Sequence, residues 1–137
     1  MKTSENGIDF IKRAEGFAPR PYDDNGKTAW GFGHDRQLGE QPPVQISRED
    51  ADLLLRNDLA TRFEPIVSAH VPLDCTQGQF DACVDFCFNL GPSSFRMMVG
   101  HGWQSVPEQM LRWTNVNSKP NAGLSARRNA EVALFNS

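Results

Sequence analysis

Residues 15–34, EGFAPRPYDDNGKTAWGFGH, decide how this chain is interpreted, because they combine a turn signal with two carboxyl groups. Asn25-Gly26 is a strong signal for a two-residue β-hairpin turn. In this register three pairs of residues face one another: Asp24 with Lys27, Asp23 with Thr28, and Tyr22 with Ala29. Because side chains alternate along a strand, Asp24 and Thr28 are expected on opposite faces of the hairpin.

Helical patterns lie on both sides of this segment. Before it, apolar residues at helical spacing predict a helix from Ser4 to Glu15, which Gly16 ends. After it, Ser47 is placed to cap a helix whose apolar face continues to Ile66. Pro65 predicts that this second helix kinks or ends there, since proline has no backbone N–H to donate.

The most apolar stretch predicts a helix at the centre of the fold. Thr76 and Gln79 form a capping box before it, and Gly91-Pro92 closes it. The helix has one polar stripe at i, i+4 and i+8: Asp81, Asp85 and Asn89. Further helices are predicted near residues 106–113 and 124–135.

The predicted fold class is α+β, mainly helical, in a single domain over residues 1–137. A small hairpin lobe takes about residues 17–46, and a helical lobe takes about residues 47–137 together with the N-terminal helix. The 137 residues suffice for one ordinary domain, and 39% hydrophobic with 23% charged residues is typical of a globular protein. No apolar run approaches the roughly 20 residues of a membrane span, so membrane insertion is not expected.

Charge and cysteine content exclude further classes. A net charge of −3 argues against a nucleic-acid binder. Residues 109–130 nevertheless contain no acidic residue, which predicts a basic helical wall facing an anionic ligand. The three cysteines are too few and too apolar in setting for a disulfide framework, and no pair of Cys or His residues has metal-site spacing. Neither a metal nor another cofactor is expected.

Glu15 and Asp24 are the candidate catalytic pair. Glu15 lies at the C-terminal end of its helix, where the unpaired carbonyls disfavour an ionised carboxylate and should raise its pKa. Asp24 lies beside a tight turn, a wetter setting that should keep it ionised. Two carboxyl groups that differ in this way are typical of glycoside hydrolysis, although both positions are also common in purely structural roles.

Several motifs together resemble the phage-type lysozymes, the endolysins of glycoside hydrolase family 24. Glu15-Gly16-Phe17, Tyr22, Asp24, Gly26 and Gly31-Phe32-Gly33-His34 resemble the family signature. Three later segments resemble the family's interlobe, central and C-terminal helices: SREDADLLLRNDL (47–59), QFDACVDFCFNLG (79–91) and GLSARRNAEVALF (123–135). The likeness therefore covers nearly the whole chain.

The resemblance implies a lysozyme-like fold and hydrolysis of the β-1,4 bond between N-acetylmuramic acid and N-acetylglucosamine in bacterial peptidoglycan. Glu15 is then the general acid, and Asp24 holds the attacking water for an inverting displacement. His34 braces the hairpin lobe, and Arg127 pairs with Glu15. That pair would lower the pKa of Glu15, against the effect of the helix end, so the net direction stays open. Substrate contacts are expected from five residues: Tyr22, Trp30, Gly31, Phe32 and Asn89.

One departure from the family pattern lies in the hairpin. The segment from Asp24 to Gly31 is one residue shorter, so that Ala29 takes the place of a threonine whose hydroxyl helps to position the water. A bulge or shifted turn that brings Thr28 into the site is the interpretation we favour. The alternatives are that Asp23 and Thr28 are the working pair, or that the site is impaired and the protein binds peptidoglycan or a partner protein without cutting it.

The sequence also gives expectations about the setting in which the protein acts. It begins without the apolar stretch of a signal peptide, which predicts accumulation in the host cytoplasm. An endolysin of a bacteriophage or prophage would then need a separate membrane-permeabilising protein to reach the wall and lyse the host cell. A monomer is expected.

Overall fold

The computed structural model describes residues 1–137, and its first helix, α1 (Glu5–Glu15), begins and ends where the sequence predicts. The hydroxyl of Ser4 accepts a hydrogen bond from the amide of Gly7 and caps the helix. Gly16, with φ of 73°, ends it. Glu15 is therefore the last residue of α1, at the point where the chain leaves the helix and enters the sheet.

A three-stranded antiparallel sheet follows, formed by β1 (Ala18–Asp24), β2 (Lys27–Gly31) and β3 (His34–Asp35). Asn25 and Gly26 both have positive φ, as a tight hairpin turn requires, and the register is the predicted one: Tyr22 opposite Ala29, Asp23 opposite Thr28 and Asp24 opposite Lys27. An irregularity in the pairing lies between Ala18 and Tyr22, before the candidate site.

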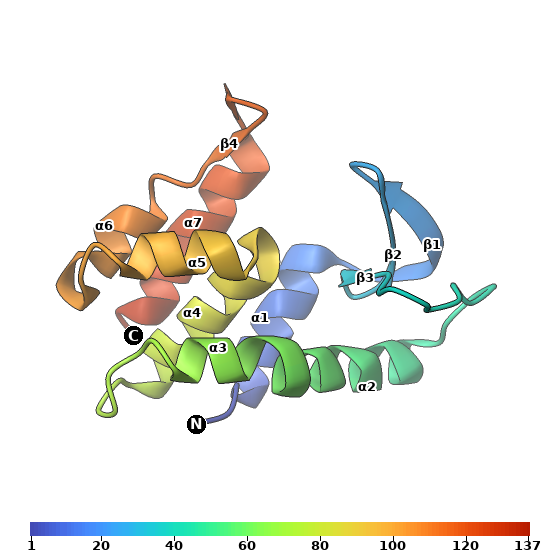
Figure 1. Cartoon of the computed structure of the whole chain (residues 1–137), viewed down its shortest axis with the longest axis horizontal. Coiled ribbons are helices and arrows are strands. Elements are labelled where there is room, and N and C mark those ends of the chain that lie inside the picture. The colour runs from blue at the N-terminus through green and yellow to red at the C-terminus, as the bar shows by residue number, and fades with distance from the viewer.

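The second helical segment is longer than predicted. α2 (Arg48–Asp58) is capped by Ser47, and a π-helical turn (Leu59–Phe63) leads into α3 (Glu64–Ser68). The helical path does not end at Pro65, but the regular α-helix is interrupted directly before it by the π-helical turn, and Pro65 lies in the first turn of α3. In Figure 1, α2 and α3 run as one rod beneath both lobes.

The helical lobe is built around α4 (Gln77–Leu90), whose capping box at Thr76 and Gln79 is present as predicted. Its residues 80–87 are all buried. Around α4 lie the other helices of this lobe, α5 (Pro92–Val99), α6 (Val106–Met110) and α7 (Ala122–Phe135). Figure 1 shows these helices at one end of the molecule and the sheet at the other, with α1 between them.

Three details of the helical lobe differ from the prediction. α6 ends at Met110 instead of near residue 113. A small hairpin, β4 (Asn115–Val116) with β5 (Lys119–Pro120), precedes α7, and its two-residue strands are too short to show an alternating pattern. α7 starts at Ala122 instead of Leu124, because the side chain of Asn121 accepts a hydrogen bond from the Leu124 amide and caps the helix.

The hydrophobic core lies mostly between α4 and its neighbours. The three cysteines are free and lie in it, Cys83 and Cys87 on the buried helix where they were expected. None of the helices combines the length and apolar character that crossing a membrane would require. The structure thus has a sheet with an exposed face, a dry helical core, and α1 ending between the two.

Candidate active site

The carboxyl group of Glu15 lies against the turn between β2 and β3. A Cβ atom added to Gly33 would come within 2.5 Å of Oε1 of Glu15, and Gly33 has φ of 76°. Both observations require glycine at this position. Gly33 is thus a site residue that was not singled out from the sequence, although it belongs to the quoted Gly-Phe-Gly-His motif.

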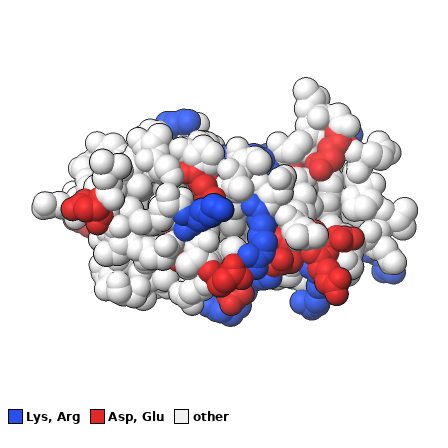
Figure 2. All heavy atoms as spheres, turned by 90° about the horizontal axis from the view of Figure 1, so that it is seen from below, with Lys and Arg blue, Asp and Glu red and all other residues white.

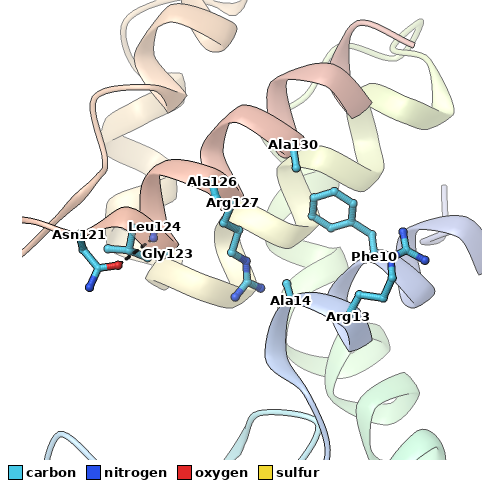
Figure 3. Close-up of a pocket in the computed structure, with 9 residues that line it drawn as sticks. All are labelled: Phe10, Arg13, Ala14, Asn121, Gly123, Leu124, Ala126, Arg127 and Ala130. Atoms are coloured by element: carbon cyan, nitrogen blue, oxygen red, sulfur yellow. Dashed lines mark hydrogen bonds between the residues drawn. The ribbon is translucent and has the colours of Figure 1, made fainter.

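Arg127 of α7 contacts Glu15 from the other side. Its Nη1 donates a hydrogen bond of 2.6 Å to Oε2 of Glu15. Its Nη2 and Nε donate to the two carboxylate oxygens of Asp85 on α4, at 2.7 and 3.1 Å. Figure 3 shows Arg127 extending from α7 toward the end of α1. The predicted Glu15–Arg127 pair is present, and Asp85 is a third member that was not predicted from the sequence.

Burial decides the pKa of Glu15. The Glu15 side chain is only 17% exposed, and this burial raises its pKa. Arg127 acts in the opposite direction, whereas the negative charges of Asp85 and Asp24 add to the effect of burial, and the net pKa is raised. The direction that the sequence left open is therefore upward, and its main cause is burial.

Behind Arg127 the charges continue into the protein interior. Arg128 is fully buried and donates from Nη2 to Glu131 and to Asn89, both at 2.8 Å. Glu131 is fully buried as well, and its carboxyl group and that of Asp85 both lie beside Nη2 of Arg128, at 2.8 and 3.9 Å. We call the set of five charged residues the carboxylate–arginine cluster: Glu15, Asp85, Arg127, Arg128 and Glu131.

This cluster corrects the prediction of a basic wall along residues 109–130. Arg127 is 9% exposed and Arg128 is buried, and both point inward to carboxylates. At the surface, Arg112 pairs with Glu108. On a different face, the underside of the molecule along α2 and α3, Figure 2 shows basic and acidic side chains beside one another. The acid-free stretch of sequence is neutralised by carboxylates that come from other parts of the chain.

The second carboxyl group, Asp24, lies on the sheet in a different environment. Alternation along the paired strands places five side chains on one face, which we call the Asp24 face: Tyr22, Asp24, Lys27, Ala29 and Asp35. Asp24 itself is exposed. Burial raises the pKa of the Tyr22 hydroxyl, and the charges of Asp24, Glu15 and Asp35 raise it further, so Tyr22 lies within electrostatic reach of all three carboxyl groups.

Asp35 is a residue of this face that was not predicted from the sequence. It pairs with Ala29 across β2 and β3, and its carboxyl group makes neither a hydrogen bond nor an ion pair within the protein. Burial raises its pKa. Asp35 was missed because it belongs to β3, which is only two residues long and therefore has no recognisable strand pattern in the sequence.

The opposite face of the sheet holds Thr28, and this corrects the favoured interpretation of that residue. Thr28 pairs with Asp23, and no bulge lies between Asp24 and Thr28 to turn its hydroxyl toward the site. Trp30 lies on the same face as Thr28, 3% exposed and 5.0 Å from the ring of His34. The expectation that Trp30 lines the cleft is therefore wrong, because its side chain is buried beside His34, whose Nδ1 lies 2.6 Å from Asp58 at the end of α2.

His34 connects the sheet to the rest of the protein. Its Nδ1 lies 2.6 Å from Oδ2 of Asp58 at the end of α2, and its Nε2 lies 2.8 Å from Oε1 of Glu40. Burial acts to lower the pKa of His34, but the hydrogen bonds to the two carboxylates outweigh it, and the pKa is raised. This geometry supports the predicted role of His34 as a brace of the lobe.

The other expected substrate contacts have varied surroundings. A Cβ on Gly31 would lie 3.3 Å from Cβ of Ala51, so this glycine allows α2 to approach the sheet. Phe32 is buried 5.4 Å from the ring of Phe17 and borders a surface hollow of about 500 Å³. Asn89 accepts the hydrogen bond from Arg128. Of the five residues, Tyr22 is the one that lies exposed on the Asp24 face.

A larger hollow of about 540 Å³ lies between α1 and α7, and Figure 3 shows the side chains that line it. Phe10 and Ala14 come from α1, and Leu124 and Arg127 come from α7. Because Arg127 is part of its lining, the ion pair with Glu15 borders this hollow. No group of three or more His, Cys, Asp or Glu side chains is arranged to hold a metal ion.

Comparisons with known proteins agree with this geometry. The sequence model of the phage lysozyme family matches residues 12–131. The endolysin of Acyrthosiphon pisum secondary endosymbiont phage 1 is 32% identical, over 100% of this chain and 99% of that protein. Among solved structures, the muramidase domain of SpmX from Asticaccaulis excentricus has a TM-score of 0.83 at 31% identity, covering 99% of this chain and 98% of the other. A lysozyme mutant of phage P22 has a TM-score of 0.79 at 31% identity, covering 100% and 99%.

The family match spans most of the chain and includes both the end of α1 and the sheet that follows it. The full-length relative shares about a third of its residues, with almost no unmatched length on either side. Together with the arrangement of Glu15, Arg127 and the sheet, these matches lead to one conclusion. The chain belongs to the phage lysozyme family.

Proposed function

We propose that Glu15 is the general acid and Asp24 the water-holding carboxylate with which this chain cuts the β-1,4 bond between N-acetylmuramic acid and N-acetylglucosamine. As a phage lysozyme, the chain is a glycosidase and an endolysin that acts on bacterial peptidoglycan. One observation supports the division of roles: Glu15 is buried with a raised pKa, whereas Asp24 is exposed.

The surroundings of Glu15 suit a group that gives up a proton. Its raised pKa keeps the carboxyl group protonated to higher pH than an ordinary glutamate, so that it has a proton for the glycosidic oxygen. When the proton leaves, Arg127 at 2.6 Å stabilises the carboxylate that forms. Burial thus favours the acid before the reaction, and the ion pair favours its conjugate base afterwards.

The surroundings of Asp24 suit the opposite role. Its exposed carboxyl group is open to a water molecule and can accept a hydrogen bond from it. In an inverting displacement, the water oxygen forms a bond to the anomeric carbon while the bond to the glycosidic oxygen breaks. The leaving oxygen takes the proton of Glu15, and Asp24 takes a proton from the water. The sugar would lie between the sheet and the end of α1, in contact with Tyr22.

The alternative, a module that binds peptidoglycan or a partner without cutting, is supported by Ala29 alone. Thr28 does not supply the missing hydroxyl, because it lies on the other face of the sheet. The intact set of Glu15, Asp24 and Arg127 favours the enzyme. Purified protein should therefore clear a suspension of chloroform-treated Gram-negative cells, and a stable suspension at enzyme concentrations far above those of an active lysozyme would contradict the enzymatic function.

We further propose that the protein accumulates as a monomer in the host cytoplasm and acts on the host cell wall after a separate protein has permeabilised the membrane. Expression in a bacterial host tests this proposal. The culture should keep its turbidity until a membrane-permeabilising protein is co-expressed or chloroform is added. Lysis by this chain alone would contradict the dependence on a partner.

A further inference from the structure

The carboxylate–arginine cluster contains a buried acid, Glu131, that the proposed mechanism does not use. Glu131 lies on α7, one helical turn beyond Arg127, and it is fully buried. Its Oε2 accepts a hydrogen bond of 2.8 Å from Nη2 of Arg128. Its Oε1 has no N–H or O–H donor within reach. A buried carboxylate oxygen without a donor is costly, so the protonation state of Glu131 needs an explanation.

The neighbouring carboxyl group of Asp85 supplies that explanation. Both groups are fully buried and lie beside the same nitrogen of Arg128, and two such close carboxyl groups in a dry interior do not both stay ionised. A proton on Oε1 of Glu131 lets this oxygen donate a hydrogen bond to Asp85, and so removes the unpaired oxygen. Asp85 receives two N–H donors from Arg127, at 2.7 and 3.1 Å, and Arg128 lies 3.9 Å away. The arginines therefore hold Asp85 in its ionised form, and the proton belongs to Glu131.

The pKa directions agree with this assignment. Burial raises the pKa of Glu131 well above its usual value, and its bond to Asp85 raises it further. Burial also acts to raise the pKa of Asp85, but the hydrogen bond from Glu131 and the charge of Arg127 outweigh it and lower the pKa. The other groups that face this pair are Arg128 and the thiol of Cys83.

We propose that Glu131 is a positioning residue: its carboxyl group carries a proton, donates it in a hydrogen bond to Asp85, and thereby keeps Asp85 ionised and Arg127 shared between Asp85 and Glu15. Two effects on Glu15 follow. The negative charge of Asp85 raises the pKa of Glu15, and Asp85 takes two of the three N–H contacts of Arg127. Without the bond from Glu131, Asp85 becomes easier to protonate, Arg127 pairs with Glu15 alone, and Glu15 ionises at lower pH.

Infrared spectroscopy tests the location of the proton without any measurement of activity. In a Glu15→Gln background, which removes the other carboxyl group of the cluster with a raised pKa, the folded protein at neutral pH should show the C=O band of a protonated carboxyl group. The band should disappear on adding Glu131→Gln and should persist with Glu108→Gln, a change of an exposed glutamate. Absence of the band, or its loss only with Asp85→Asn, would overturn the proposal.

The pH dependence of kcat/KM tests the effect on Glu15, and this part rests on the proposed function. Glu131→Gln retains an N–H donor for Asp85 and an oxygen for Arg128, so it should keep the wild-type profile. Glu131→Met removes the donor, so the alkaline limb should move to lower pH, with a loss of about tenfold above the wild-type optimum, a typical coupling within one hydrogen-bond network.

If Glu131→Met does not fold, Asp85→Asn provides the second variant, because it removes the same negative charge at constant size and should move the alkaline limb in the same direction. Equal shifts in Glu131→Gln and Glu131→Met would show that an ionised Glu131 is needed and would overturn the proposal. A wild-type protein without activity would instead contradict the proposed function and leave the infrared result standing.

Discussion

The two carboxyl groups of the site lie in contrasting regions. Glu15 is part of the carboxylate–arginine cluster, in which each acid is matched by an arginine or a neighbouring acid and little water reaches the side chains. Asp24 lies on the Asp24 face of the sheet, where the neighbouring Lys27 is exposed and Asp35 has no partner. The helical core thus shields the carboxyl group of Glu15 from water, whereas the sheet leaves that of Asp24 exposed to solvent.

This difference shows how one small fold supplies an acid and a base at the same pH. Burial penalises the charged form of Glu15, and a fixed arginine limits that penalty. The acid therefore depends on the helical packing, whereas the base depends only on the hairpin turn and its register. Changes in the two regions should consequently have separable effects.

The largest expected effect comes from a change of Glu15, the shielded carboxyl group. Glu15→Gln keeps the size of the side chain and removes the transferable proton, so activity should fall by about 10³-fold or more. Loss of turbidity of chloroform-treated cells measures it. Glu108→Gln, at an exposed ion pair, is the matched control and should retain full activity. Similar activity of Glu15→Gln and the wild type would refute the mechanism.

At the solvent-exposed carboxyl group of the sheet, Asp24→Asn should lower kcat by about 10²-fold, because the amide no longer accepts a proton from water. Asp23→Asn is the matched control. Asp23 is the adjacent residue, exposed, and points to the other face of the sheet. Its change should leave the rate within about twofold of wild type, as general acid–base catalysis requires contact. A greater loss for Asp23→Asn than for Asp24→Asn would reverse the assignment.

The contact between the two regions is the turn at Gly33. Gly33→Ala places a methyl group at 2.5 Å from Oε1 of Glu15, and Gly39→Ala meets no atom within 4 Å. Both glycines have positive φ, so each change should destabilise the protein by about 1–2 kcal/mol. Only Gly33→Ala should also cost activity, by about tenfold or more, since it displaces the acid.

Chemical denaturation and turbidity assays on the same preparations separate these two effects. Equal activity losses in the Gly33→Ala and Gly39→Ala variants would mean that strain alone accounts for them. In that case the close approach of Gly33 to Glu15 would have no part in catalysis.

The smallest effect concerns the junction of the sheet with α2. The folded pKa of His34 is raised above 6.5, so its pairing with Asp58 and Glu40 stabilises the protein fully below pH 6.5. This contribution is lost as pH rises through the folded pKa. The free energy of unfolding should fall over that range in the wild type and fall less in His34→Gln. His101→Gln, at an exposed histidine, should keep the wild-type slope.

Local signals allowed much of the fold to be predicted. Ser4, Asn25-Gly26 and Thr76 act through hydrogen bonds and backbone angles of residues within a few positions, so the sequence alone reveals their effect. The predicted pairing of Tyr22 with Ala29 followed from the turn for the same reason.

The parts that could not be predicted depend on distant partners. The charge pattern alone places Arg127 in a basic wall, and its pairing with Glu15, 112 residues away in sequence, was expected only from the family resemblance. Its second partner, Asp85, lies 42 residues away and was missed. Trp30 reads as a cleft residue, but its side chain is buried beside His34, which pairs with Asp58 at the end of α2. Whether a charged or aromatic side chain is buried depends on which distant helix or strand packs against it. Patterns of neighbouring residues in the sequence do not contain that information.

The most direct test of the whole account is mass analysis of the fragments released from purified peptidoglycan, with and without borohydride reduction. We predict disaccharide peptides whose reducing end is N-acetylmuramic acid and which become reduced at that sugar, with none released by Glu15→Gln. Fragments that end in reducing N-acetylglucosamine, fragments with an anhydro ring, or equal release by Glu15→Gln would contradict a hydrolytic muramidase that uses Glu15 as its acid.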